Sequence, residues 1–367
     1  MTNEIPAFIE RDPEVILSES KAQLEAILGR ELQAAQVEQL MLQFIAYREV
    51  LLRNQFNAGM SQMLYQFSQA PVLDYIAGLV AVERLPAASA GSTVRFTLVA
   101  GHGNVLLPEG TRVATSDSEV IFFVTDDYII SPSINTIDLP VLAEIPGKSG
   151  NGYAPGTVNK ILDPLAFVST VSNLDTTGGG SDEETDEQLR ERIRLAPSQY
   201  SSAGSRASYL FYAKSANPLI KDVSVTSPIP GVVLIVPLTD ENEMPEQVIT
   251  DIYNTCNAEN VRPLTDTVIV SAPEKQDYDM EVNLVLFTDA DATGVQNQIT
   301  EALNQYAQEN RKKLGRDIVR SHINKICRID SVYDVDVVSP ASNVVIEDGE
   351  FAHCTQITVN ITGFNHG

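Results

Sequence analysis

The feature that most constrains the fold of this chain is an apolar pattern with helical spacing between residues 37 and 67. The apolar positions recur three, four and seven residues apart, which is the spacing of one face of an α-helix. They are Val37, Leu40, Met41, Phe44, Ile45, Leu51, Leu52, Met60, Met63, Leu64 and Phe67. The pattern predicts a long amphipathic helix that Pro71 ends or kinks, because proline lacks the N–H that continues a helix.

Two arginines lie at or beside this apolar stripe. Arg48 falls among the apolar positions and Arg53 follows it, with Glu49 and Gln55 nearby. Arginine is enriched at protein interfaces, so the pattern favours a helix that meets another protein. An ordinary core helix whose arginines reach out to water is the alternative. The residues predicted to contact a partner are Arg48, Glu49, Leu51, Leu52, Arg53 and Phe56.

The first half of the chain changes pattern once. Residues 1–90 are predicted to be a helical region that contains the long helix. Residues 91–177 alternate apolar and polar side chains between turns rich in glycine and proline, which predicts a small β-barrel or sandwich. Gly178-Gly-Gly180 then predicts a domain junction, and Ser181 with Glu184 predicts a capping box at the start of a new helix.

The second half alternates strands and helices. Residues 178–217 are predicted to be a helical connector, followed by two α/β modules at 218–275 and 276–367. Strands joined through helices and hairpins favour modules of the split βαβ kind. The predicted fold class is therefore multidomain α+β.

Charge limits the kinds of partner. The net charge is −24, and each region is acidic, with −5 over 1–90, −5 over 91–177 and −14 over 178–367. Nucleic acid and an anionic membrane surface are therefore disfavoured as partners. No apolar run approaches the ~18 residues that span a bilayer, and no secretory signal is visible. Three widely spaced cysteines do not form a disulfide pattern, which fits synthesis in a reducing cytoplasm.

No pattern in the sequence indicates a catalytic, metal or cofactor site. The histidines lack metal-ligand spacing, although His353-Cys354 could join Cys327 at a zinc site if the fold brought them together. Asp289-Ala-Asp-Ala-Thr-Gly294 imitates the start of a calcium loop, but Thr300 stands where the bidentate glutamate belongs. A polar turn that caps the following helix is the simpler interpretation. We therefore expect a protein that is not an enzyme and needs no cofactor.

Three blocks of sequence occur in an order that is typical of one family. The first is residues 46–57 of the long helix, followed by Leu73-Asp-Tyr75, Arg84 and Pro86-Ala87; the second is 108–113, 122–125 and 150–157; the third is Asn173 with 179–193. Together they cover roughly residues 40–195, and the C-terminal pattern agrees. The chain thereby resembles the baseplate J family, the wedge proteins of contractile phage tails and related injection machines.

The resemblance implies a structural role in a baseplate. It implies several copies in a sixfold assembly, a protein-I-like wedge partner that shares a bundle with the long helix, and contact with sheath-initiator or hub proteins. It implies assembly in the bacterial cytoplasm, no membrane insertion, and transmission of the attachment trigger to sheath contraction. C-terminal modules would contact neighbouring copies, and the edge strand at Thr355, Ile357, Val359 and Ile361 is the predicted contact.

Two other classes of function remain as alternatives. A tail adhesin or receptor-binding protein would use the β domain as its recognition unit. A cell-wall hydrolase would need a catalytic constellation, and none is visible in the sequence.

Overall fold

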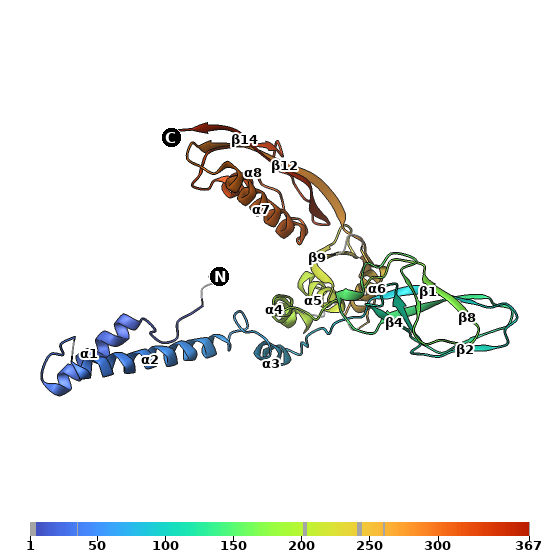
Figure 1. The fold of residues 1–367 in the computed structure, drawn as a ribbon, viewed down its shortest axis with the longest axis horizontal. Coiled ribbons are helices and arrows are strands. Elements are labelled where there is room, and N and C mark those ends of the chain that lie inside the picture. Colours follow the sequence, from blue (N-terminus) through green and yellow to red (C-terminus); the bar gives the residue numbers. More distant parts are fainter. Residues whose placement is uncertain (1–4, 35, 201–203, 241–243, 260, 367) are drawn as a thin grey trace. The chain divides into compact units, whose positions relative to one another are not determined.

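The structure is a computed structural model that describes residues 5–34, 36–200, 204–240, 244–259 and 261–366 (Figure 1). The chain forms two compact units. The first consists of Met1–Arg84 and Thr185–Ala196, and the second of Leu85–Glu184 and Pro197–Gly367. The chain therefore passes from one unit to the other three times.

The first unit is helical. Its helices are α1 (Pro13–Leu28), α2 (Val37–Ser61), α3 (Val72–Gly78) and α4 (Asp186–Leu195). Asp12 caps the start of α1, and Gly29 ends it with a φ of 65° that a residue without a Cβ adopts at little cost. α1 lies along α2 (Figure 1). The helix expected over 37–67 is α2, which ends at Ser61 rather than Phe67.

The start of α4 differs from the prediction. Its capping box is formed by Thr185 and Gln188, not by Ser181 and Glu184. Glu184 is buried instead, and its carboxylate accepts a hydrogen bond from the Leu85 N–H at 3.0 Å. Both pairs fit the capping-box spacing, so the sequence pattern alone could not say which one precedes the first turn.

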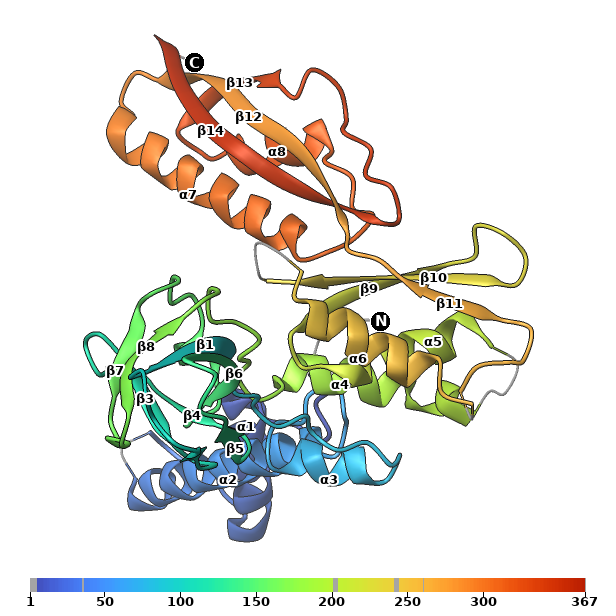
Figure 2. The same ribbon diagram turned by 90° about the vertical axis from the view of Figure 1, so that its right-hand side faces the viewer.

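The second unit begins with a β-barrel (Figure 2). Six strands form one sheet in the order β7-β3-β4-β6-β1-β8. Their bounds are β1 (Gly91–Leu98), β3 (Arg112–Thr115), β4 (Ile121–Val124), β6 (Thr136–Ala143), β7 (Val158–Ile161) and β8 (Val168–Asn173). β2 (Val105–Leu107) and β5 (Tyr128–Ile130) form a two-stranded ribbon, and Lys148–Gly150 is a short 3₁₀ turn. Alternate residues of β1, namely Val94, Phe96 and Leu98, are buried in the barrel core.

Asn173 of β8 connects the two outer strands of the sheet, β7 and β8, by hydrogen bonds. Its side-chain oxygen accepts a hydrogen bond from the Val158 N–H, and its carbonyl accepts one from the Gly156 N–H, both at 2.9 Å. Its amide group donates to the carbonyls of Ala154 (3.1 Å) and Asp175 (2.7 Å). The sheet is therefore nearly closed, and the prediction of a multidomain α+β chain with a central β-barrel is confirmed.

The glycine segment that was predicted as a junction is built into the barrel. Gly178 exchanges two backbone hydrogen bonds with Gly91, at 2.8 and 3.0 Å. Gly180 exchanges two with the side chain of Asn151, at 2.9 and 2.8 Å. A Cβ on Gly180 would lie 2.4 Å from the Gly147 carbonyl oxygen, so the close approach requires glycine. Gly180 therefore serves close packing, whereas a Cβ on Gly178 would meet nothing within 4 Å.

A three-stranded module follows the barrel. It consists of α5 (Arg206–Ala216), β9 (Ile220–Thr226), β10 (Val232–Thr239), α6 (Glu246–Cys256) and β11 (Thr267–Val270), after a 3₁₀ turn at Ala196–Tyr200. The sheet order is β11-β10-β9, with β10 antiparallel to β9 and parallel to β11. α5 and α6 cover one face of this sheet, where apolar side chains from helices and strands form one core (Figure 2).

The last module has the same sheet pattern, a central strand with one antiparallel and one parallel neighbour, but a different order of elements along the chain. It consists of β12 (Glu274–Phe287), α7 (Ala292–Arg311), α8 (Arg320–Cys327), β13 (Val332–Ser339) and β14 (Glu350–Asn365). The sheet order is β13-β12-β14, and β12 is parallel to β14. In both modules the parallel strands are direct neighbours. Neither is therefore a split βαβ unit in the strict sense, in which another strand lies between them.

Candidate partner-binding surfaces

The helix α2 has two faces of opposite character. Its outer face, called here the α2 apolar face, carries large side chains that the chain leaves exposed, with Phe44 at 66% and Leu52 at 61%. The members of the α2 apolar face are Val37, Leu40, Met41, Phe44, Ile45, Tyr47, Leu51, Leu52 and Phe56. A soluble chain rarely exposes a contiguous apolar surface unless another molecule contacts it.

The inner face of α2 is more polar. Asn57 is buried there, and its side-chain oxygen accepts hydrogen bonds from the N–H groups of Phe8 (2.8 Å) and Ile9 (3.0 Å). Its amide group donates to the Ile9 carbonyl at 2.9 Å. The segment before α1 is thus held on α2 by hydrogen bonds, which leaves the apolar face free.

The six residues predicted to contact a partner divide between these faces. Leu51, Leu52 and Phe56 belong to the α2 apolar face, and Arg48 is exposed among its members. Glu49 and Arg53 instead pair with each other, with Arg53 Nε donating to Glu49 Oε1 at 2.9 Å. Arg53 also donates to the Glu10 carbonyl at 3.2 Å, so it faces the N-terminal segment of its own chain.

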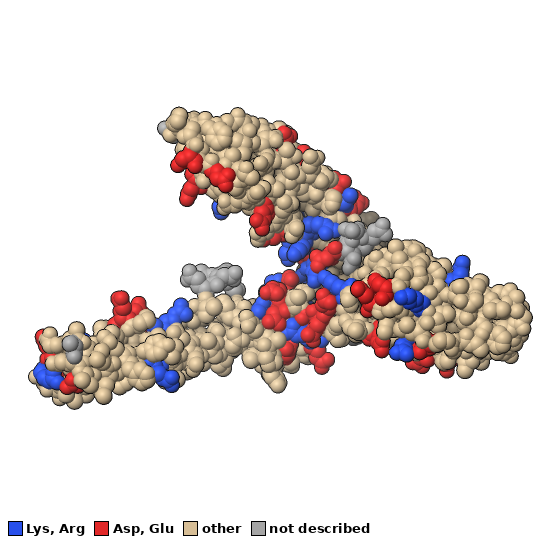
Figure 3. Space-filling model, viewed as in Figure 1, with Lys and Arg blue, Asp and Glu red and all other residues tan. Residues whose placement is uncertain are grey.

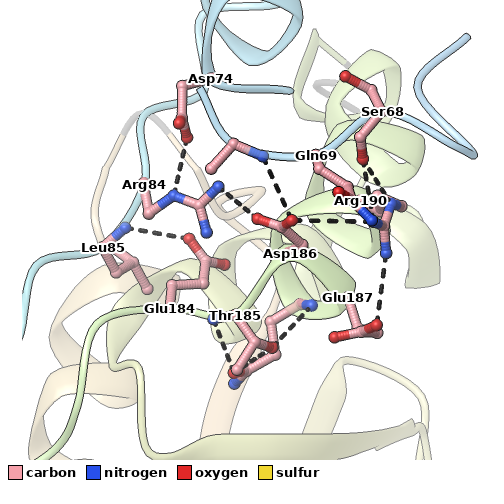
Figure 4. Close-up of polar contacts among 12 residues, drawn as sticks. Ser68, Gln69, Asp74, Arg84, Leu85, Glu184, Thr185, Asp186, Glu187 and Arg190 are labelled. Carbon is pink, nitrogen blue, oxygen red and sulfur yellow. Dashed lines mark hydrogen bonds and ion pairs between the residues drawn. The ribbon is translucent and has the colours of Figure 1, made fainter. Parts of the chain in front are cut away.

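An ion-pair network joins α3 to α4 within the first unit (Figure 4). Arg84 donates from Nε to Asp74 Oδ1 at 2.7 Å and from its terminal nitrogen to Asp186 Oδ1 at 2.8 Å. Arg190 of α4 donates to the Ser68 carbonyl at 2.9 Å. Arg84 is 102 positions from Asp186, and Arg190 is 122 positions from Ser68, so no local pattern indicated these contacts.

The network also changes the acidity of Asp186. Burial alone would raise the pKa of this carboxyl group. Hydrogen bonds from Arg84 and from the Ala70 N–H, together with the positive charges of Arg84 and Arg190, outweigh burial and lower the pKa below its usual value. The carboxylate form of Asp186 is thus the one that holds α4 in place.

The predicted contact strand β14 proves to be partly internal. Val359 is buried in the core of its own module, and Ile357 and Ile361 pack against that core. The Thr355 hydroxyl donates to the Tyr278 carbonyl of β12 at 3.1 Å, and Gln296 of α7 donates to the Val359 carbonyl at 2.7 Å. The side chains proposed for contact between copies are therefore engaged within their own module. α7 covers one face of β14 (Figure 2), whereas its backbone edge is the outer one of the order β13-β12-β14, so contact between copies through that edge stays a prediction.

The described residues show no arrangement with evident chemistry. No cluster of three potential metal ligands occurs among them. Cys256 and Cys327 are buried and free, and His353 pairs with Asp277 at 2.8 Å. The calcium-like segment lies at the start of α7, where Asp291 is the N-cap residue. Within the same residues, no helix combines the length and hydrophobicity that a membrane span requires.

Comparison with known protein families decides where this architecture belongs. The model of the baseplate J-like protein barrel domain matches residues 93–180, that of the central domain matches 201–272, and that of the C-terminal domain matches 278–360. These matches cover more than half of the chain. The chain belongs to the baseplate J-like protein family. The resemblance that the sequence blocks indicated is confirmed.

Two relatives in this baseplate J-like family come from phages. Baseplate protein J of Escherichia phage P2 is 31% identical over 182 residues, which are 49% of this chain and 60% of that protein. Putative baseplate protein gp29 of Haemophilus phage HP1 (strain HP1c1) is 35% identical over 123 residues, 32% of this chain and 30% of that protein. The chain thus spans less than two thirds of the length of the curated relatives it matches.

A solved structure shows a weaker likeness. A chain in the cryo-EM structure of the anti-feeding prophage baseplate, sixfold symmetrised, aligns over 93% of this chain and 90% of its own length. The TM-score is 0.45 and the sequence identity is 12%, a level at which the likeness carries no argument about function.

Proposed function

We propose that this chain is a structural wedge component of the baseplate of a contractile phage tail or a related injection particle. The observation that carries the proposal is the α2 apolar face, which a single chain leaves in water. Membership of the baseplate J-like family and the names of the two phage relatives support the baseplate as its location.

The exposed surface has an energetic consequence. Full burial of one Leu, Ile, Phe or Met side chain contributes about 1.5–3 kcal/mol, and the α2 apolar face holds nine large apolar residues. Because these residues are 37–66% exposed in the free chain, a partner helix that covered the face would gain part of this contribution from each of them, which offsets an association cost of ~4–15 kcal/mol. Arg48, exposed among these residues, would lie at the contact, where a guanidinium group suits a carboxylate or carbonyl of the partner.

The proposed partners follow from the same surface and from the family. A protein-I-like wedge protein and a further copy of this chain would complete a helical bundle with α2. Sheath-initiator and hub proteins would contact the assembled wedge. In this role the chain is needed for baseplate assembly and passes the attachment trigger to sheath contraction, without catalysis.

A substitution on the α2 apolar face tests the proposal. Leu52→Asp should prevent incorporation of the chain into particles, because a carboxylate would be buried at the bundle contact. Gln43→Asp is the matched control, since it puts the same charge on an exposed position of α2 outside the apolar face. Both variants are produced together with all other particle proteins, and sedimented particles are probed for the chain.

Two measurements separate the outcomes. Hydrogen exchange of the barrel peptides should match the unmodified chain in both variants, which shows that the second unit is folded, and exchange of the α3 and α4 peptides reports in the same way on the first unit. Particles that contain Leu52→Asp at the level of Gln43→Asp would refute the role of α2. Equal hydrogen-exchange protection of α2 in the free chain and in the particle would refute it independently.

A further inference from the structure

One end of the barrel carries no charged side chain. Three stretches that meet there, residues 96–108, 128–137 and 164–174, contain no Asp, Glu, Lys or Arg, although a fifth of the whole chain is charged. In Figure 3 the far right-hand end of the molecule accordingly shows neither blue nor red atoms. Such a gap in charge is unusual on the surface of a chain with a net charge of −24.

Hydrogen bonds hold the three stretches together. The Leu98 N–H donates to the Asn135 carbonyl at 2.7 Å, and the Val99 N–H donates to the Phe167 carbonyl at 2.8 Å. The two ring nitrogens of the buried His102 lie 2.6 Å from the Gly103 carbonyl oxygen and 3.0 Å from that of Ile134. The end of β1 and the starts of β6 and β8 therefore form one continuous surface.

Large apolar side chains project from this surface. Leu106 and Ile129 are cross-strand neighbours on the β2–β5 ribbon, and Ile129 is 74% exposed. Phe167 is 53% exposed on a backbone with a φ of 71°, a strained conformation for a residue with a side chain. Such strain concentrates at functional positions. The five exposed residues, called here the barrel tip, are Val99, Leu106, Ile129, Ile134 and Phe167.

We infer that the barrel tip binds the barrel tip of a second copy of this chain. This contact is separate from the α2 apolar face and lies on the other compact unit. Two chains of this net charge repel each other, so they approach most easily through surfaces that carry no charge. An apolar patch is also complementary to itself, which a twofold contact between identical copies requires.

The size of the patch sets the expected strength of the contact. The exposed area of the five residues is roughly 500 Å². The largest apolar patch on an ordinary monomer is ~300–600 Å², and such a patch is often functional. A specific interface normally takes ~800 Å² from each partner. The tip contact is therefore weak between free chains and becomes populated where an assembly holds copies close together.

Site-directed cross-linking tests this contact in the full chain. The background carries Leu52→Asp, which disables the α2 apolar face, and Cys354→Ser, which leaves only the buried Cys256 and Cys327. Ile129→Cys reports on the barrel tip. Ile145→Cys is the control, because Ile145 is equally exposed, at 72%, and follows the end of β6 that points away from the tip.

A short bis-maleimide should give several-fold more covalent dimer with Ile129→Cys than with Ile145→Cys. Sodium chloride should increase this excess, because ~1 M salt shortens the Debye length to ~3 Å and screens the repulsion between copies. Adding Leu106→Asp to the Ile129→Cys chain should remove the excess. Equal yields at the two positions, or an excess that survives Leu106→Asp, would overturn the inference. Neither result would affect the proposed role of α2, which is measured in particles.

Discussion

Asn173→Ala removes the side chain that joins the outer strands of the barrel. The buried amide loses its hydrogen bonds with the Val158 N–H and with the carbonyls of Ala154 and Asp175, together with a longer one to the Tyr153 carbonyl at 3.5 Å. Each contributes a net ~1 kcal/mol, and a buried group left without a partner costs up to ~3 kcal/mol. We therefore expect the barrel to lose about 3 kcal/mol of stability against local opening between β7 and β8.

Native-state hydrogen exchange is the suitable assay, because a chain with several domains does not unfold in one two-state step. A loss of about 3 kcal/mol corresponds to roughly hundredfold faster exchange in peptides that contain β7, since every 1.4 kcal/mol is tenfold. Peptides from α2, which belongs to the other unit, should be unaffected.

Asn159→Ala is the matched control for this substitution. Asn159 is exposed and makes one hydrogen bond, to the Gly156 carbonyl at 3.0 Å. Its replacement should change stability by less than about 0.5 kcal/mol, as surface substitutions usually do. If Asn173→Ala and Asn159→Ala accelerate exchange equally, the amide of Asn173 does not close the barrel.

Three further substitutions test other features. Gly180→Ala should lower the melting temperature of the barrel in calorimetry, because its Cβ would meet oxygens at 2.4 and 2.7 Å, whereas Gly178→Ala has open space and should leave it unchanged. Hydrogen bonds from Arg112 hold the pKa of Asp163 at about 2, so Arg112→Ala should move its NMR titration midpoint up toward 3.8. Because the pKa of Asp163 is depressed in the folded chain, its ionised carboxylate stabilises that chain above about pH 4. This contribution is lost as the pH falls toward 2 and the carboxylate is protonated. Arg84→Ala should speed hydrogen exchange in α4 by roughly tenfold, since a partly exposed pair is worth about 1–2 kcal/mol, and unchanged exchange there would contradict the role of the network.

Local periodicity was sufficient to predict the helices and strands, but not which face of each one is buried in its own chain. The stripe from Val37 onward correctly indicated a helix, and alternation along β1 and β6 correctly indicated a barrel. The usual assumption that an apolar stripe faces the core of its own chain fails for α2. Its inner side buries only the small or medium apolar residues Leu42 and Ala46, and Asn57 and Arg53 bind backbone groups of the N-terminal segment there.

Long-range pairings account for the rest of the difference. The partners of Arg84 and the burial of Glu184 depend on segments that come together only in the folded chain. The strand β14 was predicted as a contact because an edge strand presents unpaired backbone groups, and it is the outer strand of the order β13-β12-β14. The sequence could not reveal that α7 covers one of its faces. In each of these places the sequence showed the right residue types, and the tertiary fold decided what they contact.

The two compact units alternate along the sequence, and this limits where the chain can be cleaved or truncated. Because α4 belongs with residues 1–84 although it follows the barrel in sequence, the two units are connected after Arg84, after Glu184 and after Ala196. A protease that cuts once cannot release either unit intact. A fragment that starts at residue 178 would carry α4 without Arg84 and without the Ser68 carbonyl that binds Arg190. A gene truncated anywhere between 85 and 184 would therefore yield a helical unit that lacks its last helix.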